Sequence, residues 1–505
     1  MFKPNDALTY IDEPYVRCNK FINKKPAGGI LPDYDSVKDR LPSPVWDGHE
    51  SCVECYDEAW RIAFSNLRKP AAGSGLVSDF IDTAFNGFTF MWDSSFMVMF
   101  GKYAANVFNF QTTLDNFYAK QHRDGFICRE ICETENADQF YRHDPSSTGP
   151  NIMPWSEWEY YKITGDKERL NKVFDPLMGY YNWLRLNRTW PNGMYWSTGW
   201  GCGMDNIIRL QPGYSNEFSH GHQVWIDATV QQIFSAKLLI KMGRELGRSD
   251  GISALEDDVS RLSDAVNSLL WSEDDGFYYD MWKNGELNRV KTVGSYWALM
   301  AEIVPPERLD RFVAHLNNER EFNRPNRVPA LSADDKNYCA EGGYWRGGVW
   351  APTTYMVLKG LEKNGYDKLA FDIAESHLKC VVSVFEKTGT LWENYSPEYP
   401  EHGNPAKDRF VGWTGLSPIS IMFEYVFGIR SDTQHNKIVW NVNLCERHGI
   451  NRYPFKGAEV GLICEARNKG EKPVIHVKSK IPFTLEIHWD SDGGNKETLN
   501  IQPDI

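Results

Sequence analysis

The sequence contains no long apolar run and no long basic run. No stretch approaches the roughly 20 apolar residues that a membrane-spanning helix needs. Lysine and arginine adjoin one another only in short groups such as Lys24-Lys25 and Arg68-Lys69. The formal net charge of −13 opposes binding to a phosphate backbone. We therefore expect no contact with a membrane and no nucleic-acid partner.

Signals for export and for bound metal are also missing. Residues 1–10, MFKPNDALTY, have neither the basic start nor the apolar centre of a secretory leader, so we expect a cytoplasmic protein. The 10 cysteines are scattered through a chain too long to need a disulfide framework, which favours reduced thiols. No calcium loop is recognisable. We expect no metal and no cofactor; the pairs Cys52/Cys55 and Cys128/Cys132 would form a zinc site only if they converged.

Aromatic residues, in contrast, are abundant. The chain of 505 residues has 19 Trp, 24 Tyr and 27 Phe, which is more indole than a packed interior alone tends to use. An indole ring can stack on the C–H face of a pyranose while its N–H group bonds a hydroxyl. Aromatic walls therefore suit a small carbohydrate ligand, and an aromatic core without a ligand is the alternative.

Helical periodicity dominates residues 51–430. Apolar side chains recur at steps of three and four between residues 225 and 246, and again between residues 255 and 270. The short linker at residues 247–253 makes these two predicted helices antiparallel neighbours. We expect about six such helix pairs along the chain.

Four of the predicted helices end in the same way. Each leads into a polar turn with a glycine and then an aromatic, extended segment, at Gly125, Gly193, Gly276 and Gly389. Helix pairs stacked around one axis would place all four turns at the same end of a ring, where they would form a funnel. The sequence therefore predicts an all-α fold, an (α/α)6 toroid of six helical hairpins. A less ordered all-α assembly is the alternative.

The two ends of the chain differ from the helical region. Residues 1–50 are rich in proline and are predicted to form an irregular arm. Residues 431–505 hold short β-branched runs separated by Gly, Asn and Lys turns, which predict a small antiparallel β appendage. The expected domains are thus an arm (1–50), a catalytic toroid (51–430) and a β-sheet domain (431–505).

Two carboxylates follow the second and the fourth aromatic turns. Asp205 lies in a glycine-rich loop, where glycine lets the backbone approach a ligand, and Glu393 lies between Trp392 and Asn394. Glycoside hydrolysis needs one protonated acid at the leaving oxygen and a second carboxylate that attacks the sugar or activates water. Aromatic surroundings would raise the pKa of such an acid by desolvation. Alternatively, either carboxylate caps a helix or pairs with an arginine such as Arg209.

Six sequence blocks lie in order between residues 88 and 430. They are WDSSF (92–96), GPNIMPWSEWEYYKITGD (149–166), GMDN followed by an arginine (203–209), YWRGGVW (344–350), WENYSP (392–397) and GWTGLSP (412–418). Together they resemble glycoside hydrolase family 63 and its mannosylglycerate and glucosylglycerate hydrolase-like branch, which is related to the trehalases. The chain departs from trehalases at Gly149-Pro150-Asn151, where they tend to have Gln-Pro-Pro, and it lacks their Pro-Arg-Asp lead before Trp92. Trehalose is therefore not the expected substrate.

The resemblance implies a toroid and an inverting attack on an α-linked glucoside or mannoside, with Asp205 as general acid and Glu393 as general base. It also implies that the WDSSF and YWRG blocks hold the sugar at the −1 subsite. The expected substrate-binding residues are Trp92, Asp93, Arg129, Trp200, Gly203, Asn206, Arg209, Tyr344, Trp345, Arg346, Trp350, Trp392 and Trp413.

Three of these residues have alternative roles. Asp93 precedes a helical apolar run and would serve there as a helix N-cap. Arg129 would form a surface ion pair with Glu130 or Glu133. Arg346 would either buttress the base or grip a substrate oxygen.

The predicted reaction is thus hydrolysis of a small carbohydrate with inversion at the anomeric carbon. The two carboxyl groups are expected to lie about 6.5–9.5 Å apart, which leaves room for the attacking water. A toroid phosphorylase or epimerase, or a non-catalytic carbohydrate-binding protein, is the alternative. A phosphorylase needs no catalytic base, and a degenerate binding protein would be expected to lack one carboxylate. The aglycone and the linkage stay open, and a homo-oligomer is compatible with the sequence.

Overall fold

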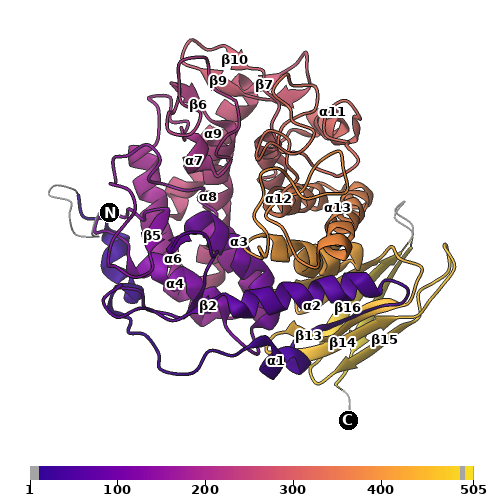
Figure 1. Cartoon of the computed structure of the whole chain (residues 1–505). Coiled ribbons are helices and arrows are strands. Elements are labelled where there is room, and N and C mark those ends of the chain that lie inside the picture. The colour runs from indigo at the N-terminus through magenta and orange to yellow at the C-terminus, as the bar shows by residue number, and fades with distance from the viewer. Residues whose placement is uncertain (1–10, 490–494, 504–505) are drawn as a thin grey trace.

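Helices dominate the chain as far as Val426, and strands dominate after it (Figure 1). The structure, a computed structural model, describes residues 11–489 and 495–503. The main helices are α2 (Glu50–Ser65), α3 (Met91–Gly101), α4 (Thr113–Ala119), α5 (Met153–Thr164), α6 (Lys167–Asn187), α8 (Ile226–Leu246), α9 (Ile252–Leu269), α10 (Trp297–Met300), α11 (Pro306–Ala314), α12 (Ala351–Lys363), α13 (Asp367–Thr388) and the π-helical η9 (Ser417–Val426).

An inner set of helices forms a closed series of contacts. Helix α3 contacts α5, and the series continues through α8, α10, α12 and η9, which contacts α3 again. Every residue of α3 and of η9 is buried, and both segments are largely apolar, as helices in the interior of a protein are. Helices such as α9 and α13 lie outside the series, and α9 buries mainly the positions spaced three or four apart that face α8. In Figure 1, α3 and α8 lie left of centre, with α12 and α13 opposite them.

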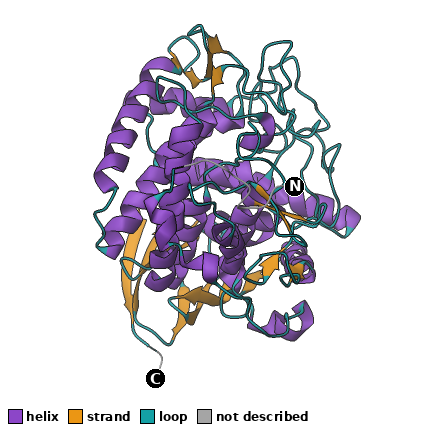
Figure 2. Ribbon diagram, turned by 90° about the vertical axis from the view of Figure 1, so that its left-hand side faces the viewer, coloured by secondary structure: helices purple, strands orange, loops and turns teal. Residues whose placement is uncertain are grey.

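The predicted hairpin of α8 and α9 is confirmed. The helices contact one another, and α8 ends at Gly247, whose left-handed φ of 69° closes the last turn. The glycines of the four aromatic turns also share one backbone conformation. Their φ angles are 99° at Gly125, 81° at Gly193, 68° at Gly276 and 69° at Gly389, which favours glycine at each turn. Long loops gather on one side of the helices, at the right in Figure 2.

The C-terminal region is larger than a small antiparallel sheet. Its strands are β11 (Ile429–Asp432), β12 (Lys437–Val442), β13 (His448–Phe455), β14 (Ala458–Cys464), β15 (Ile475–Ser479), β16 (Phe483–Trp489) and β17 (Asn495–Ile501). They form two four-stranded sheets, of order β1-β13-β14-β15 and β11-β12-β16-β17. Side chains from the two sheets contact each other, with the ring centroids of Phe455 and Phe483 5.7 Å apart.

The predicted combination of a helical region and a C-terminal β region is confirmed. One detail is wrong: the appendage is not wholly antiparallel, because β12 pairs with β16 in parallel from Lys437↔Thr484 to Val442↔Trp489. The chain passes through β13, β14 and β15 of the other sheet between these two strands, and that long excursion allows the parallel pairing.

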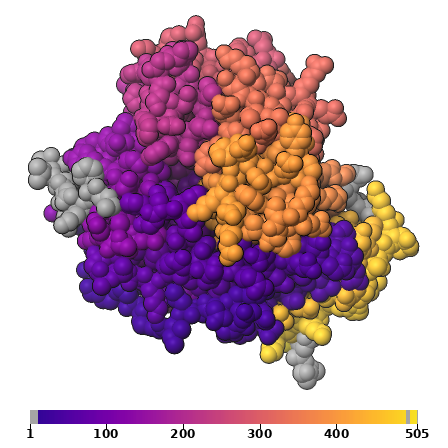
Figure 3. All heavy atoms as spheres, viewed as in Figure 1, coloured from indigo at the N-terminus to yellow at the C-terminus, as the bar shows by residue number. Residues whose placement is uncertain are grey.

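The prediction of an irregular N-terminal arm is wrong in one part. Strand β1 (Ser43–Trp46) pairs with β13 in antiparallel fashion, so it belongs to a C-terminal sheet. The short helix α1 (Tyr34–Val37) precedes β1. Figure 3 shows the indigo N-terminal part and the yellow C-terminal part sharing the lower face of the molecule. The prediction for residues 1–10 lies outside the described residues.

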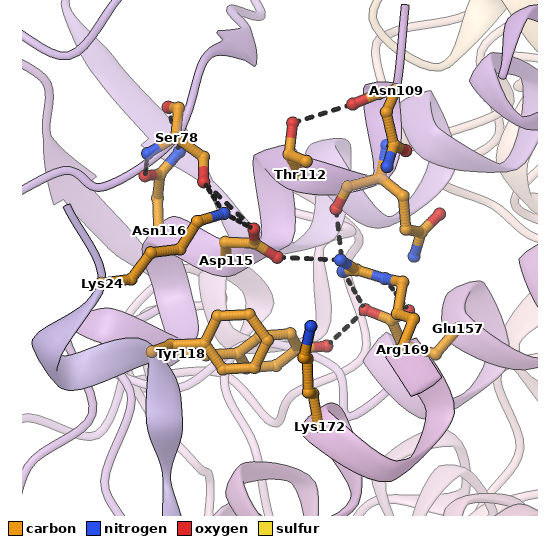
Figure 4. A network of polar contacts seen from close by, with 12 residues as sticks. Lys24, Ser78, Asn109, Thr112, Asp115, Asn116, Tyr118, Glu157, Arg169 and Lys172 are labelled. Carbon is orange, nitrogen blue, oxygen red and sulfur yellow. Dashed lines mark hydrogen bonds and ion pairs between the residues drawn. The ribbon is translucent and has the colours of Figure 1, made fainter. Parts of the chain in front are cut away.

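A buried polar network ties the arm to the helices (Figure 4). The Lys24 ammonium lies 2.5 Å from Asp115 Oδ2 and 2.6 Å from Ser78 Oγ. The other oxygen of Asp115 accepts a hydrogen bond from Arg169 at 3.0 Å, and Arg169 also donates to Glu157 at 2.7 Å. Each buried carboxylate is thus paired with a cation, which offsets the cost of removing its charge from water.

All ten cysteines of the chain are free. Among the residues that the structure describes, no helix has the length and apolar character needed to cross a bilayer. Within the same residues, no group of three or more His, Cys, Asp or Glu side chains is arranged to hold a metal ion.

Candidate active site

A narrow pocket of about 80 Å³ lies at the N-terminal ends of α3, α5, α12 and the short helix η8 (Thr414–Leu416). Residues from six separate parts of the chain meet in it. Its lining consists of Phe85, Phe90, Trp92, Asp93, Arg129, Gly149, Pro150, Trp200, Gly203, Asp205, Tyr344, Trp345 and Trp413. The pocket is walled mainly by aromatic rings, and two carboxyl groups face into it. This combination suits a ligand that offers both C–H faces and hydroxyl groups.

Two short strands place Trp92 and Asp93. Strand β4 (Phe88–Phe90) pairs with β5 (Glu130–Cys132), and Met91 N–H donates to the Arg129 carbonyl at 2.8 Å. The N-cap position of α3 is Phe90, so Asp93 lies inside the first turn and is not the cap. Burial raises the pKa of Asp93 well above its ordinary value, and its own backbone N–H lowers it in part. The pKa shift favours the protonated form, which can donate as well as accept a hydrogen bond.

Asp205 follows a sharp turn. Helix α7 (Gly199–Cys202) ends at Gly203, whose φ of 78° turns the chain toward the pocket. A side chain at Gly203 would also lie only 3.0 Å from the Trp92 ring. Burial raises the pKa of Asp205 to about 7, Arg129 opposes this shift, and the carboxylate of Glu393 adds to it. Asp205 is therefore protonated to a large extent near neutral pH, as a general acid must be.

Glu393 is held by three groups. Its Oε1 accepts a hydrogen bond from the Tyr344 hydroxyl at 2.8 Å, and its Oε2 accepts one from the Lys407 backbone N–H at 3.1 Å. The Trp413 indole N–H donates to its backbone carbonyl at 2.8 Å. Burial raises the pKa of Glu393, and the bonds from Tyr344 and Lys407 oppose that rise.

Glu393 is linked to the pocket through Tyr344. Its side chain is buried and accepts the hydrogen bond of Tyr344, which lines the pocket. The negative charge of Glu393 raises the pKa of both Asp205 and Asp93, so the three carboxyl groups share one electrostatic site. Neither Asp205 nor Glu393 pairs with Arg209, which removes that alternative.

The expectation that Arg209 binds substrate is wrong. Its guanidinium is buried and lies 2.7 Å from Asp227 and 2.5 Å from Asp280. It also stacks over the Trp225 ring, 4.3 Å from the centroid. The charge of Arg209 therefore compensates the two buried carboxylates. Because Asp227 lies on α8 and Asp280 on strand β9 (Asp280–Trp282), Arg209 links these two elements.

Arg129 lines the pocket, and it is also paired with a carboxylate. Its Nε donates to the Ser146 carbonyl at 2.7 Å, and its Nη2 lies 3.3 Å from Glu130. The guanidinium packs between aromatic rings, 4.7 Å from the centroid of Phe140 and 5.3 Å from that of Trp200. The expected ion pair with Glu130 thus exists, but beside the pocket and not on the outer surface.

Four other expected substrate-binding residues are not in the lining. Trp350 is buried behind Trp345, with the two rings parallel and 3.9 Å apart. Trp392 stacks on His402 at 3.7 Å, and Asn206 hydrogen-bonds only to the backbone. Arg346 follows a lining residue but lies outside the pocket, with its Nε buried and lacking a partner among the described residues. Trp350 and Asn206 contact the segment of Tyr344 and Trp345 and so support that part of the pocket wall.

Sequence reasoning missed several parts of the site. Phe85 and Phe90 line the pocket but lie just before the first quoted block, and no motif marks them. Gly149 and Pro150 begin one of the six sequence blocks but were not expected to bind substrate, although both line the pocket. The backbone N–H of Lys407 leaves no trace in a sequence, because any residue except proline can supply it.

Comparison with known proteins identifies the family. The family model described as the mannosylglycerate hydrolase MGH1-like glycoside hydrolase domain matches residues 87–414, which is more than half of the chain. The chain belongs to this glycoside hydrolase family. It is therefore a glycosidase, and the matched region contains both Asp205 and Glu393.

Several known proteins are similar to part of this glycosidase. An uncharacterized protein of Borreliella burgdorferi is 26% identical over 407 residues, 78% of this chain and 82% of that protein. The mannosyl-oligosaccharide glucosidase of Saccharomyces cerevisiae is 24% identical over 296 residues, 49% of this chain and 34% of that protein. The mannosylglycerate hydrolase of Rubrobacter radiotolerans is 25% identical over 191 residues, 37% of this chain and 40% of that protein.

Solved structures agree on the fold of the glycosidase. The family 63 mannosylglycerate hydrolase of Thermus thermophilus in complex with glucose matches with a TM-score of 0.59 and 18% identity, over 72% of this chain and 99% of that chain. A sialidase structure matches with a TM-score of 0.67 and 13% identity, over 93% of this chain and 43% of that chain. At such identities the likeness shows the fold alone.

Proposed function

We propose that the chain is an inverting glycoside hydrolase that cleaves an α-linked glucoside or mannoside, with Asp205 as general acid and Glu393 as general base. The observation that carries the proposal is the unequal treatment of two carboxyl groups in one aromatic site. Burial holds the pKa of Asp205 at about 7, whereas two hydrogen bonds counter the effect of burial on Glu393. Acid and base catalysis requires two carboxyl groups whose surroundings differ, so that one holds a proton and the other can accept one.

In this mechanism Asp205 gives its proton to the glycosidic oxygen as the bond to C1 breaks. Glu393 takes a proton from a water molecule that attacks C1 from the opposite face, and the anomeric configuration inverts. Trp92, Asp93 and Trp345 bind the sugar ring and keep it in position during the attack. The separation of about 6.5–9.5 Å between the two carboxyl groups stays a prediction of the mechanism.

We also propose that the helices form the six-hairpin toroid. The closed series from α3 through α5, α8, α10, α12 and η9 supplies six inner helices. The helices α4, α6, α9, α11, α13 and α2 are the corresponding outer partners in this proposal.

The cations near the site bear on the chemical nature of the leaving group. Of the three arginines among the expected substrate-binding residues, only Arg129 lines the pocket, and it is already paired with Glu130. A glycerate carboxylate would therefore lack a free cation in the lining. A charge-assisted hydrogen bond contributes about 1.5–3 kcal/mol, so its loss costs roughly tenfold or more in transition-state binding.

We expect neutral disaccharides to be better substrates than glycosylglycerates. The assay is sugar release from kojibiose, nigerose, α-mannobiose, glucosylglycerate and mannosylglycerate at equal concentration. At least one neutral disaccharide is expected to give a kcat/KM about tenfold above either glycerate. A preference for a glycerate would show that Arg129 exchanges Glu130 for the substrate. No release from any of the five would count against the proposed function itself.

The pH dependence follows from the two pKa shifts. The acid must be protonated, so kcat/KM is expected to fall as the pH rises through about 7, the value to which burial raises the pKa of Asp205. The base must be ionised, so kcat/KM is also expected to fall at low pH. Because burial raises the pKa of Glu393, the midpoint of this fall is expected to lie above the ordinary pKa of a glutamate. A profile that stays flat from pH 6 to 9 would contradict the role of Asp205.

The phosphorylase alternative is tested by the need for phosphate. Inorganic phosphate would replace the water and no base would be required, whereas Glu393 is buried and held by specific donors in this chain. We expect sugar release at the same rate with and without phosphate, and free sugar as the product.

A further inference from the structure

Both polar atoms of the Asn206 side chain form hydrogen bonds with one short segment of backbone. It follows the acid Asp205 directly, and its Oδ1 accepts a hydrogen bond from the Trp345 N–H at 2.9 Å. Its Nδ2 donates to the Gly343 carbonyl at 3.0 Å. These two backbone groups lie on either side of Tyr344. The amide of Asn206 therefore forms a clamp around this one residue.

Tyr344 has a backbone conformation that needs such support. Its φ is 63°, in the left-handed region that bulky side chains seldom adopt. Strained residues of this kind persist only where the surroundings hold them, and they cluster at functional sites. The N–H group of Gly348 adds a bond to the Tyr344 carbonyl at 3.0 Å, and the Trp350 ring packs edge-on against the tyrosine at 4.9 Å.

The strained conformation has a chemical result. It brings the Tyr344 hydroxyl to 2.8 Å from Glu393 Oε1, while the tyrosine ring lines the pocket. A chain of two links thus joins Asp205 to Glu393, namely the clamp of Asn206 on Tyr344 and the bond from Tyr344 to Glu393. The loops that carry these residues are far apart in the sequence, and this path is a direct connection between them.

We propose that Asn206 is a positioning residue that holds Tyr344 in its left-handed conformation and thereby fixes the general base relative to the general acid. The proposal rests on the assignment of Asp205 and Glu393 as the catalytic pair. It revises the expectation that Asn206 contacts the sugar, because both of its polar groups are already bonded to the backbone. Inversion depends on the separation of the two carboxyl groups, so a residue that sets this separation acts on turnover.

The first test is a double-mutant cycle with Asn206→Ala and Tyr344→Phe. Each single variant is expected to lower kcat by about 10- to 100-fold with KM changed less than about threefold, because ground-state contacts with the sugar remain. In the Tyr344→Phe background, Asn206→Ala is expected to lower kcat by less than about threefold, because the two residues act through one hydrogen bond. Effects that multiply, or an effect confined to KM, would overturn the proposal.

The pH profile gives a second readout that a purely structural role would not move. The Tyr344 hydroxyl lowers the pKa of Glu393, so losing this bond raises that pKa. The acid limb of kcat/KM is therefore expected to move to higher pH in both single variants and by the same amount in the double variant. An unchanged acid limb in Asn206→Ala would contradict the link to Glu393.

Asn364→Ala is the matched control. Asn364 also donates two side-chain hydrogen bonds to backbone carbonyls, at 2.9 Å to Leu299 and 2.7 Å to Gly360, at the C-terminal end of α12. It is expected to lower the melting temperature without changing kcat or the acid limb. If Asn364→Ala lowered kcat as much as Asn206→Ala, general loosening would replace positioning as the explanation.

A crystal structure of Asn206→Ala tests the same point without any assay. Tyr344 is expected to leave the left-handed region and to lose its hydrogen bond to Glu393. If φ of Tyr344 and that bond are unchanged, Asn206 is not the clamp. Failure of the catalytic assignment looks different, because Glu393→Gln would then retain turnover whatever the result for Asn206.

Discussion

Replacing Asp205 by Asn, or Glu393 by Gln, is expected to lower kcat by about 10²- to 10⁴-fold, the range that general acid and base groups contribute. Both replacements keep the shape of the side chain and remove its ability to transfer a proton. Asp310→Asn is the control, since Asp310 is exposed, accepts a hydrogen bond from Tyr366 at 2.6 Å and does not line the pocket. It is expected to leave kcat unchanged.

A reactive leaving group separates the two roles. A glycosyl fluoride needs little protonation as it departs, so Asp205→Asn is expected to recover most of its loss on this substrate. Glu393→Gln is expected to stay inactive, because the attacking water still lacks its base. Recovery by Glu393→Gln instead of Asp205→Asn would exchange the two assignments, and near-normal turnover by either variant on a disaccharide would refute its role.

Loss of activity in Asp205→Asn should not come with loss of the fold. Burial raises the pKa of this carboxyl from 3.8 to about 7, so the carboxyl lowers stability progressively as the pH rises from 3.8 to about 7, and by its full amount above pH 7. The amide has no such cost. The melting temperature of Asp205→Asn at pH 8 is therefore expected to equal or exceed that of the wild type, and a lower value would show that the carboxylate stabilises the fold.

Arg209→Met is expected to lower the free energy of unfolding by about 3–5 kcal/mol, the usual cost of breaking a buried ion pair on one side. Asp227 and Asp280 would then be left in the interior without a cation, at positions where both are buried. Urea unfolding measures the change. Adding Asp227→Asn and Asp280→Asn to Arg209→Met is expected to restore part of the stability, because the uncompensated charges are removed.

Lys368→Met is the matched control for Arg209→Met. Lys368 pairs with Asp372 at 3.0 Å, one helical turn away and exposed to solvent. Exposed pairs contribute about 0–1 kcal/mol, so this variant should unfold nearly as the wild type does. If Arg209→Met were as stable as wild type but raised KM, Arg209 would be a substrate ligand after all.

The local structure of the helical region was largely readable from the sequence. The stripe that predicts α8 and α9 arises because a helix repeats every 3.6 residues, and the linker at Gly247 was visible as well. Pairing between distant strands was not readable. Nothing local in Lys437–Val442 shows that it lies parallel to Phe483–Trp489. Ser43–Trp46 is too short to be recognised as a strand from its sequence, and it contains a proline.

The candidate site shows the same division. The blocks around Asp205 and Glu393 marked both carboxylates, and the structure places them in one electrostatic site. The role of Arg209 could not be read, since Asp227 and Asp280 lie 18 and 71 residues away along the chain. Trp350 illustrates a further limit, because a tryptophan that stacks behind the wall and one that faces the sugar look alike in a sequence.

Proton NMR of the anomeric signals during cleavage tests the central claim most directly. The substrate is the member of the five-sugar panel that the enzyme cleaves fastest, and spectra are recorded before mutarotation mixes the anomers. An inverting enzyme acting on an α-linkage is expected to release the β-sugar first, with no signal from Asp205→Asn or Glu393→Gln. First release of the α-sugar would mean retention, and with it a nucleophile in place of the base that Glu393 is proposed to be.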